Sequence, residues 1–181
     1  MSGTTSTPLA AVRQPWLWGP FSALGLGLAT AVIGLDQVHK WWMLSLYAIQ
    51  DRGRVAVLPF LDLVYVKNLG VSYGLLLQEG RWGQWLLAGF AAVAASAMAV
   101  WLARGVGRRL VAASVGLIIG GAISNAIDRL SLGGVADFFS LHAFGFYWYV
   151  FNIADVAIVA GVLGLLYDSL RPSRNNAAKS T

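Results

Sequence analysis

The sequence predicts an all-α membrane protein in which four transmembrane helices are joined to a small extracytoplasmic β-rich cradle and a short interfacial helix. Two observations lead to this fold class. Of the 181 residues, 57% are hydrophobic and only 12% are charged, whereas about a quarter of the residues in a soluble domain are charged. In addition, four apolar stretches approach the ~20 residues that a helix needs to cross a bilayer. These stretches are 16–35, 82–103, 110–127 and 147–166.

Charged residues mark the ends of the four stretches. The first ends at Asp36, the second at Arg104 and the third at Asp128, while the fourth is interrupted only by Asp155. The first stretch lacks a small-residue cleavage site, so we expect a retained helix and not a removable signal peptide. Tryptophans, which favour membrane interfaces, stand near the ends of the stretches: Trp16, Trp18, Trp41, Trp42, Trp82, Trp85 and Trp148.

The segment between the first two stretches, about 41–81, is the expected cradle. It contains a group of residues that favour strands, with Pro59 at the edge and a turn at 68–70. The following segment, 71–78, is expected to form the interfacial helix. We interpret the loop either as a cradle for a substrate or as a simple cover for the bundle. The strand-favouring residues are Val55, Val57, Leu63, Val64, Tyr65 and Val66.

The chain is expected to form one membrane domain, 16–170, between two disordered cytoplasmic tails, 1–15 and 171–181. Basic residues set its orientation, because cytoplasmic loops are enriched in lysine and arginine. The totals on the two sides, seven against six, hardly differ, but Arg104, Arg108 and Arg109 are concentrated in one short turn. We therefore place that turn and both termini in the cytoplasm. The net charge of +5 is read as membrane anchoring and not as nucleic-acid binding.

Four aspartates are then expected near the outer surface of the membrane: Asp36, Asp128, Asp137 and Asp155. Asp36 and Lys40 have the i,i+4 spacing of a helical ion pair, and Asp128 is either paired with Arg129 or free for another role. Asp155 has no nearby cation in the sequence. An acid within the membrane without an evident partner is a candidate functional residue.

Amide and glycine residues accompany these acids. Asn125 shares a helix face with Asp128 and Arg129, and Asn152 shares another with Asp155. Amides can hold a carboxylate or a peptide backbone by hydrogen bonds, and they can equally join helices. Gly120 and Gly121 allow either a helix or a substrate backbone to come close, and close helix packing is the simpler interpretation.

The composition excludes several kinds of chemistry. The chain has no cysteine and only two histidines, which excludes disulfides, thiol catalysis, thiolate metal sites and a histidine metal cluster. Nothing in the sequence requires a metal or an organic cofactor.

Five motifs follow one another along the chain: DQVHK at 36–40, NLGVSYG at 68–74, GGAISNAIDR at 120–129, VADF at 135–138 and FNIAD at 151–155. In this order and spacing they resemble the bacterial lipoprotein signal peptidases (signal peptidase II), which are four-helix aspartyl peptidases of the inner membrane. The resemblance covers about residues 20–170. Ser72 and Tyr73 stand where alanine and phenylalanine are usual, and Ala136 stands where valine is usual, which affects the expected substrate preference and not the mechanism.

The resemblance implies that Asp137 and Asp155 are the catalytic pair and that Asp36 and Lys40 form the structural polar motif. It also implies a set of residues that bind substrate or support the site: Asn68, Gly70, Gly121, Asn125, Asp128, Arg129, Asn152 and Ala154.

The implied activity is removal of the signal peptide from prolipoproteins by cleavage before a diacylglyceryl-modified cysteine. Two nearby carboxylates that share one proton can do this without serine, cysteine or metal. The ionised carboxylate activates water, and the protonated one donates to the scissile carbonyl. The expected partners are the prolipoprotein and membrane lipid, and we expect a monomer in the bacterial inner membrane with its active site near the extracytoplasmic surface.

Two other functions are compatible with intramembrane acids. A proton- or cation-coupled transporter would spread its acids across the membrane depth. A non-catalytic assembly protein would use the polar residues only for helix packing and would tolerate asparagine at both Asp137 and Asp155.

Overall fold

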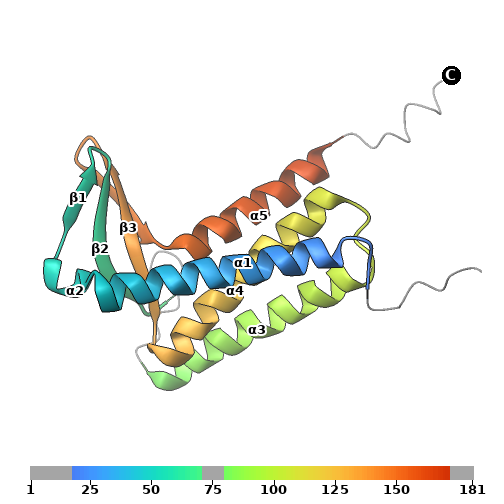
Figure 1. Cartoon of the computed structure of the whole chain (residues 1–181), viewed down its shortest axis with the longest axis horizontal. Coiled ribbons are helices and arrows are strands. Elements are labelled where there is room, and N and C mark those ends of the chain that lie inside the picture. Colours follow the sequence, from blue (N-terminus) through green and yellow to red (C-terminus); the bar gives the residue numbers. More distant parts are fainter. Residues whose placement is uncertain (1–17, 71–79, 172–181) are drawn as a thin grey trace, which may run out of the picture.

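The structure is a computed structural model that describes residues 18–70 and 80–171 of the chain. Figure 1 shows a bundle of long helices with a small sheet at one end. The long helices are α1 (Ser22–Trp41), α3 (Arg81–Ala103), α4 (Arg109–Ser131) and α5 (Ile153–Leu170). The strands are β1 (Val55–Leu58), β2 (Leu61–Asn68), β3 (Val135–Ala143) and β4 (Phe146–Phe151). The π-helix η1 (Trp42–Leu46) and the short helix α2 (Ile49–Arg52) lead from α1 to the sheet.

Helix α4 is the centre of the bundle and packs against α1, α3 and α5. Its glycines allow this, because a residue without a side chain lets two helix backbones come close. A Cβ atom at Gly120 would lie 2.7 Å from the carbonyl oxygen of Ala29 on α1. A Cβ atom at Gly121 would lie 2.5 Å from the carbonyl oxygen of Ala154 on α5. Close helix packing therefore accounts for both glycines.

Three helices in the described part of the chain, α3, α4 and α5, are long and apolar enough to cross a membrane. Helix α1 has 20 residues but is not among them. The expectation of four spans is thus supported at three positions. Helix α1 also begins at Ser22 and continues past Asp36 to Trp41. The charge at Asp36 does not end the helix, because Lys40 lies one turn later and pairs with it.

The sheet is antiparallel with the strand order β1-β2-β3-β4. Strands β1 and β2 occupy the segment in which the sequence predicts strands, and β3 and β4 add to them from beyond α4. The register pairs Val66 with Asp137 and Asn68 with Val135. Residues 135–138 are all buried, so β3 is the strand by which the sheet packs against the bundle.

The expected start of the last helix is wrong. Residues 146–151 form β4, and α5 begins only at Ile153. The segment FYWYVF is rich in aromatic residues, which favour strands, and it continues directly from β3 through a tight turn. Asn152 then begins the helix as its N-cap.

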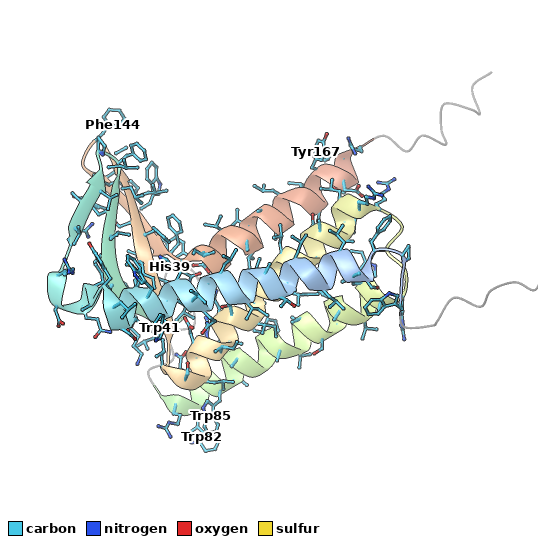
Figure 2. All side chains as sticks on the ribbon, viewed as in Figure 1. His39, Trp41, Trp82, Trp85, Phe144 and Tyr167 are labelled. Carbon is cyan, nitrogen blue, oxygen red and sulfur yellow. The ribbon has the colours of Figure 1, made fainter. Side chains whose placement is uncertain are left out.

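Several exposed aromatic residues lie where a membrane interface is expected. Figure 2 shows Trp41, Trp82 and Trp85 toward the sheet end of the bundle and Tyr167 toward the other end. The expected interfacial helix at 71–78, with Ser72 and Tyr73, lies outside the described residues. So do the tail 1–15, Trp16, and all but the first residue of the tail 171–181.

Candidate active site

Asp137 lies on β3 and is almost completely buried, with 1% of its surface exposed. Two side-chain amides donate to its carboxylate. Asn68 Nδ2 lies 3.1 Å from Asp137 Oδ2, and Asn152 Nδ2 lies 2.6 Å from Asp137 Oδ1. The β2–β3 register brings Asn68 to this position, since Asn68 pairs with Val135 two residues earlier on β3.

Asp155 lies in the first turn of α5 and takes part in a capping box with Asn152. The backbone N–H of Asp155 donates to Asn152 Oδ1 at 2.9 Å, and the backbone N–H of Asn152 donates to Asp155 Oδ2 at 3.2 Å. Asn125 Nδ2 on α4 donates to Asp155 Oδ1 at 2.9 Å. The carboxylate is therefore held from both its own helix and the neighbouring one.

One side chain, Asn152, connects the two aspartates. Its amide nitrogen donates to Asp137, and its amide oxygen accepts from the backbone of Asp155. The same nitrogen also lies 3.2 Å from Asn125 Oδ1. Asn152 is completely buried, so this bridge is protected from water. Strand β3 and helix α5 thus present their carboxylates to one site.

The environment of Asp137 favours its protonated form. Burial, first, and the neighbouring carboxylate of Asp155, second, raise the pKa of Asp137 to about 7. The hydrogen bonds from Asn68 and Asn152 act in the opposite direction and stabilise the charged form. Because desolvation and a like charge both disfavour ionisation, one proton can stay on the pair at neutral pH.

Lys40 lies behind this pair and neutralises two further buried acids. Its ammonium group is 2.6 Å from Asp36 Oδ2 and 2.7 Å from Asp128 Oδ2, and it lies 3.3 Å from Asn125 Oδ1. The expected Asp36–Lys40 pair is confirmed. The alternative in which Asp128 pairs with Arg129 is wrong, because tertiary packing brings Lys40 to Asp128.

Asp36 and Asp128 in turn hold the two segments that carry the candidate catalytic residues. Asp36 Oδ1 accepts from the backbone N–H of Ala154 on α5 at 3.0 Å. Asp128 Oδ2 accepts from the backbone N–H of Ala136 on β3 at 3.0 Å. Each of these N–H groups belongs to the residue just before an aspartate of the pair. The buried cluster of Lys40, Asp36 and Asp128 therefore sets the positions of Asp137 and Asp155.

Arg129 has a different position from the one expected beside Asp128. Its guanidinium donates to the carbonyl oxygens of Gly70 at 3.0 Å and Asn125 at 3.2 Å. Gly70 is also held by Asn68, whose side-chain oxygen accepts from its backbone N–H at 3.0 Å. Arg129 therefore fixes the end of β2 against α4, beside the amide that binds Asp137.

An open groove of about 370 Å³ lies next to Asp155. Asn68, Gly70, Asn125 and Arg129 border it, so the structure brings these expected residues to one place. The rest of its wall is mostly apolar. This part of the wall consists of Leu87, Phe90, Ala91, Ala94, Ala122, Val135, Tyr149, Ile158 and Val159.

Some site residues had no signal in the sequence. Gln37 donates to Asp128 Oδ1 at 2.9 Å, and Ser124 donates to Asp36 Oδ2 at 2.7 Å. The hydroxyl of Tyr149 lies 3.5 Å from Asp155 Oδ2. Gln37 and Ser124 fall within quoted motifs, but their partners are on another helix. Within residues 18–70 and 80–171, no three acidic or histidine side chains converge in a way that would hold a metal ion.

The family model and the curated relatives point to one family. The family model described as signal peptidase (SPase) II matches residues 28–171. A lipoprotein signal peptidase of Methylobacterium sp. (strain 4-46) is 50% identical over 156 residues, covering 86% of this chain and 94% of that protein. One of Rhodopseudomonas palustris (strain ATCC BAA-98 / CGA009) is 52% identical over 151 residues, covering 81% and 92%. A solved bacterial membrane enzyme has a similar fold, with a TM-score of 0.70 at 24% identity, over 88% of this chain and 100% of that one.

Proposed function

Because the chain belongs to the signal peptidase II family of aspartic peptidases, we propose that Asp137 and Asp155 are the catalytic pair of a lipoprotein signal peptidase. The observation that carries the proposal is the Asn152 bridge, which holds both carboxylates at one site. The shifted pKa of Asp137 supports it, because a pair that retains one proton at neutral pH supplies both an acid and a base.

In this mechanism Asp137 holds the proton and Asp155 is ionised. Asp137 is the more deeply buried of the two, whereas Asp155 borders the groove. Asp155 removes a proton from a water molecule whose oxygen attacks the scissile carbonyl carbon. Asp137 gives its proton to the carbonyl oxygen as negative charge develops there. The carbon–nitrogen bond then breaks as the departing amine takes up the proton that Asp155 accepted. A hydroxyl of the tetrahedral intermediate returns its proton to Asp137 as the carboxylic acid forms.

The proposed substrate is a prolipoprotein, cleaved immediately before a diacylglyceryl-modified cysteine. The apolar wall of the groove suits this substrate, since its signal peptide and its acyl chains are both apolar. The side chains of Asn68 and Arg129 border the same groove and are placed to hold the peptide backbone near the aspartates. Gly121 and Ala154 support the site by letting α4 and α5 pack closely.

We further propose that α1 spans the membrane with α3, α4 and α5, and that the aspartates face the extracytoplasmic side of the inner membrane. Phe21, just before α1, and Asp168, near the end of α5, line one pocket, which supports termini on the same side. Arg108 and Arg109 lie at that end, and basic residues favour the cytoplasmic side. We propose that the protein acts as a monomer.

The test uses purified protein in lipid, a diacylglyceryl-modified prolipoprotein, and a gel shift that follows release of the signal peptide. We expect Asp137→Asn and Asp155→Asn each to reduce cleavage by about 10²–10⁴-fold, the usual contribution of a positioned acid or base. Asp51→Asn is the matched control, because Asp51 is an exposed acid on α2. A metal chelator should leave cleavage unchanged.

Each alternative gives a distinct result. Near-normal cleavage by either folded variant would show that the pair is wrongly assigned. If wild-type protein leaves the prolipoprotein intact, the transporter and assembly functions become the better explanations. Folding of each variant is checked by its thermal unfolding profile in the same lipid.

A further inference from the structure

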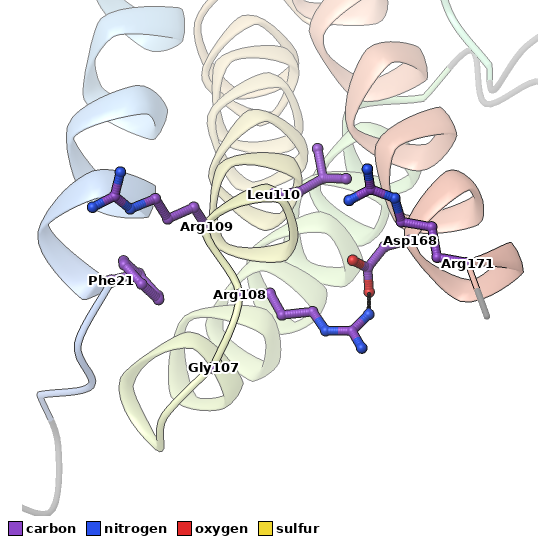
Figure 3. Close-up of a pocket in the computed structure, with 7 residues that line it drawn as sticks. All are labelled: Phe21, Gly107, Arg108, Arg109, Leu110, Asp168 and Arg171. Carbon is purple, nitrogen blue, oxygen red and sulfur yellow. Dashed lines mark hydrogen bonds and ion pairs between the residues drawn. The ribbon is translucent and has the colours of Figure 1, made fainter. Parts of the chain in front are cut away.

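A second polar site lies at the end of the bundle opposite the sheet. A pocket of about 800 Å³ opens between the start of α1, the N-terminus of α4 and the C-terminus of α5. Figure 3 shows that arginines line both sides of it: Arg109 extends toward α1, and Arg108 and Arg171 lie toward Asp168 on α5. None of these residues belongs to the aspartate site or contributes to the proposed peptide hydrolysis.

The pocket has an excess of positive charge. Arg108 is paired with Asp168, with 2.8 Å between Nη1 and Oδ2. Within the described part of the chain, Arg109 and Arg171 form no ion pair, and they instead lie over the rings of Phe21 at 5.8 Å and Tyr167 at 4.8 Å. The pocket is thus lined by three guanidinium groups and a single carboxylate. The first turn of α4 has no acidic residue and no side-chain cap, so the positive end of its dipole adds to the same field.

The position of the pocket along the apolar helices indicates that its ligand comes from the membrane. Two apolar helices end at this level, since α4 begins at Arg109 and α5 ends at Leu170. The outer face of α5, on the side of the helix opposite Asp168, is exposed and apolar over its last two turns. There Leu163, Leu166 and Leu170 have 58%, 52% and 74% of their surface exposed. A ligand bound in the pocket would therefore have its polar part at the arginines, at the end of the apolar helices.

We propose that this pocket binds the head group of an anionic phospholipid. Arg171 donates to the phosphate oxygens, because guanidinium groups form charge-assisted, often bidentate, hydrogen bonds with phosphate. Arg109, on the α1 side of the pocket, adds to the positive field. Phe21 and Leu110 contact the glycerol region, and the acyl chains extend from there along the apolar surface of the bundle. The Arg108–Asp168 pair forms one wall of the pocket and remains intact. The proposal does not depend on the peptidase activity.

The test measures lipid binding to the purified full-length protein by native mass spectrometry. Phosphatidylglycerol is the anionic probe and phosphatidylcholine the zwitterionic control. We expect wild-type protein to prefer phosphatidylglycerol by about tenfold or more, and the double variant Arg109→Gln/Arg171→Gln to lose that preference. Arg104→Gln is the control, because it removes one charge at the same end of the bundle but outside this pocket.

Four results would overturn the proposal: equal binding of the two lipids by wild type, a preference that survives in the double variant, an equal loss in Arg104→Gln, or displacement of phosphatidylglycerol by millimolar inorganic phosphate. The last result would assign the pocket to a free anion. Thermal unfolding without added lipid shows whether the double variant is folded. If it is not, Arg109→Lys/Arg171→Lys keeps the charges but loses the bidentate geometry, and a preference that stays at the wild-type level in this variant would also overturn the proposal.

Discussion

Asn152 donates its side-chain amide to Asp137 at 2.6 Å while its other amide atom caps the helix that carries Asp155. The two functions can be separated, because serine caps a helix about as well as asparagine but has no amide to reach Asp137. We expect Asn152→Ser to unfold near the wild-type temperature and to cleave about 10–100-fold more slowly. Asn152→Ala should also lose about 1 kcal/mol of stability through the missing cap.

The same pair of variants changes the pH dependence of cleavage. Loss of the amide donor removes a bond that stabilises the charged form of Asp137, so its pKa rises further above 7. Cleavage by wild-type protein should fall as the pH rises through about 7, when the shared proton leaves. In Asn152→Ser this decline should move to higher pH, and a profile unchanged from wild type would contradict the proposed contact between Asn152 and the pair.

Burial of Asp137 also predicts a dependence of stability on pH. Its pKa is about 7 in the folded protein against an ordinary value of 3.8, so the folded state binds the proton more tightly. The resulting stability is fully present below about pH 4 and is lost as the pH rises through 7.

Asp137→Asn has no titrating group at this position, so its stability should lack this dependence on pH. Between about pH 5 and about pH 8, its melting temperature should rise relative to that of wild type by several degrees, an effect of roughly 2–3 kcal/mol. Asp51→Asn serves as the exposed control. A difference between Asp137→Asn and wild type that is constant with pH would show that Asp137 does not carry a raised pKa.

Replacing Lys40 should have a large effect on stability. In Lys40→Met, the buried carboxylates of Asp36 and Asp128 lose their common cation, and removal of one partner from a buried ionic cluster costs about 3–5 kcal/mol. Thermal unfolding should show this loss, and adding Asp128→Asn to Lys40→Met should recover part of it. Lys67→Met, at an exposed position on β2, should change little. Equal effects of the two lysine variants would mean that the cluster is unimportant.

Gly121 tests the contact between α4 and the start of α5. A Cβ atom there would lie 2.5 Å from the backbone oxygen of Ala154, and backbone cannot move aside as a flexible side chain would. Gly121→Ala should displace Asp155 and reduce kcat by at least about tenfold, as small misplacements in active sites do. Gly89→Ala on α3 is the control, since nothing lies within 4 Å of a Cβ atom at that position. It should keep its activity and gain up to about 1 kcal/mol.

Much of the fold follows from local sequence. The apolar stretches 82–103 and 110–127 coincide closely with α3 and α4, because an apolar run of this length has few alternatives to a helix. The segment 147–151 is expected to be helical but forms a strand, because a short apolar run does not by itself distinguish a strand from a helix. The cap at Asn152 and the pairing of β4 with β3 decide between strand and helix for this segment.

The site was predictable in its members but not in its contacts. The motifs named Asn68, Asn125 and Asn152, and the structure brings all three to the aspartates. The partner of Asp128 could not be read from its neighbour Arg129, because the true partner, Lys40, is 88 positions away in the sequence. Gln37 and Tyr149 could not be predicted from the sequence for the same reason, because only the fold brings each of them to its partner.

The contact between Asp36 and the backbone of Ala154 joins the first described helix to the last one. During synthesis α1 is made before α5, so this contact, and with it the placement of Asp155, forms only after α5 has been made. Asp36 and Lys40 form an ion pair within one turn of α1, so each already has a partner before α5 is made. A nascent chain without α5 therefore has neither the assembled carboxylate pair nor the complete groove, since Asp155, Ile158 and Val159 all come from this helix.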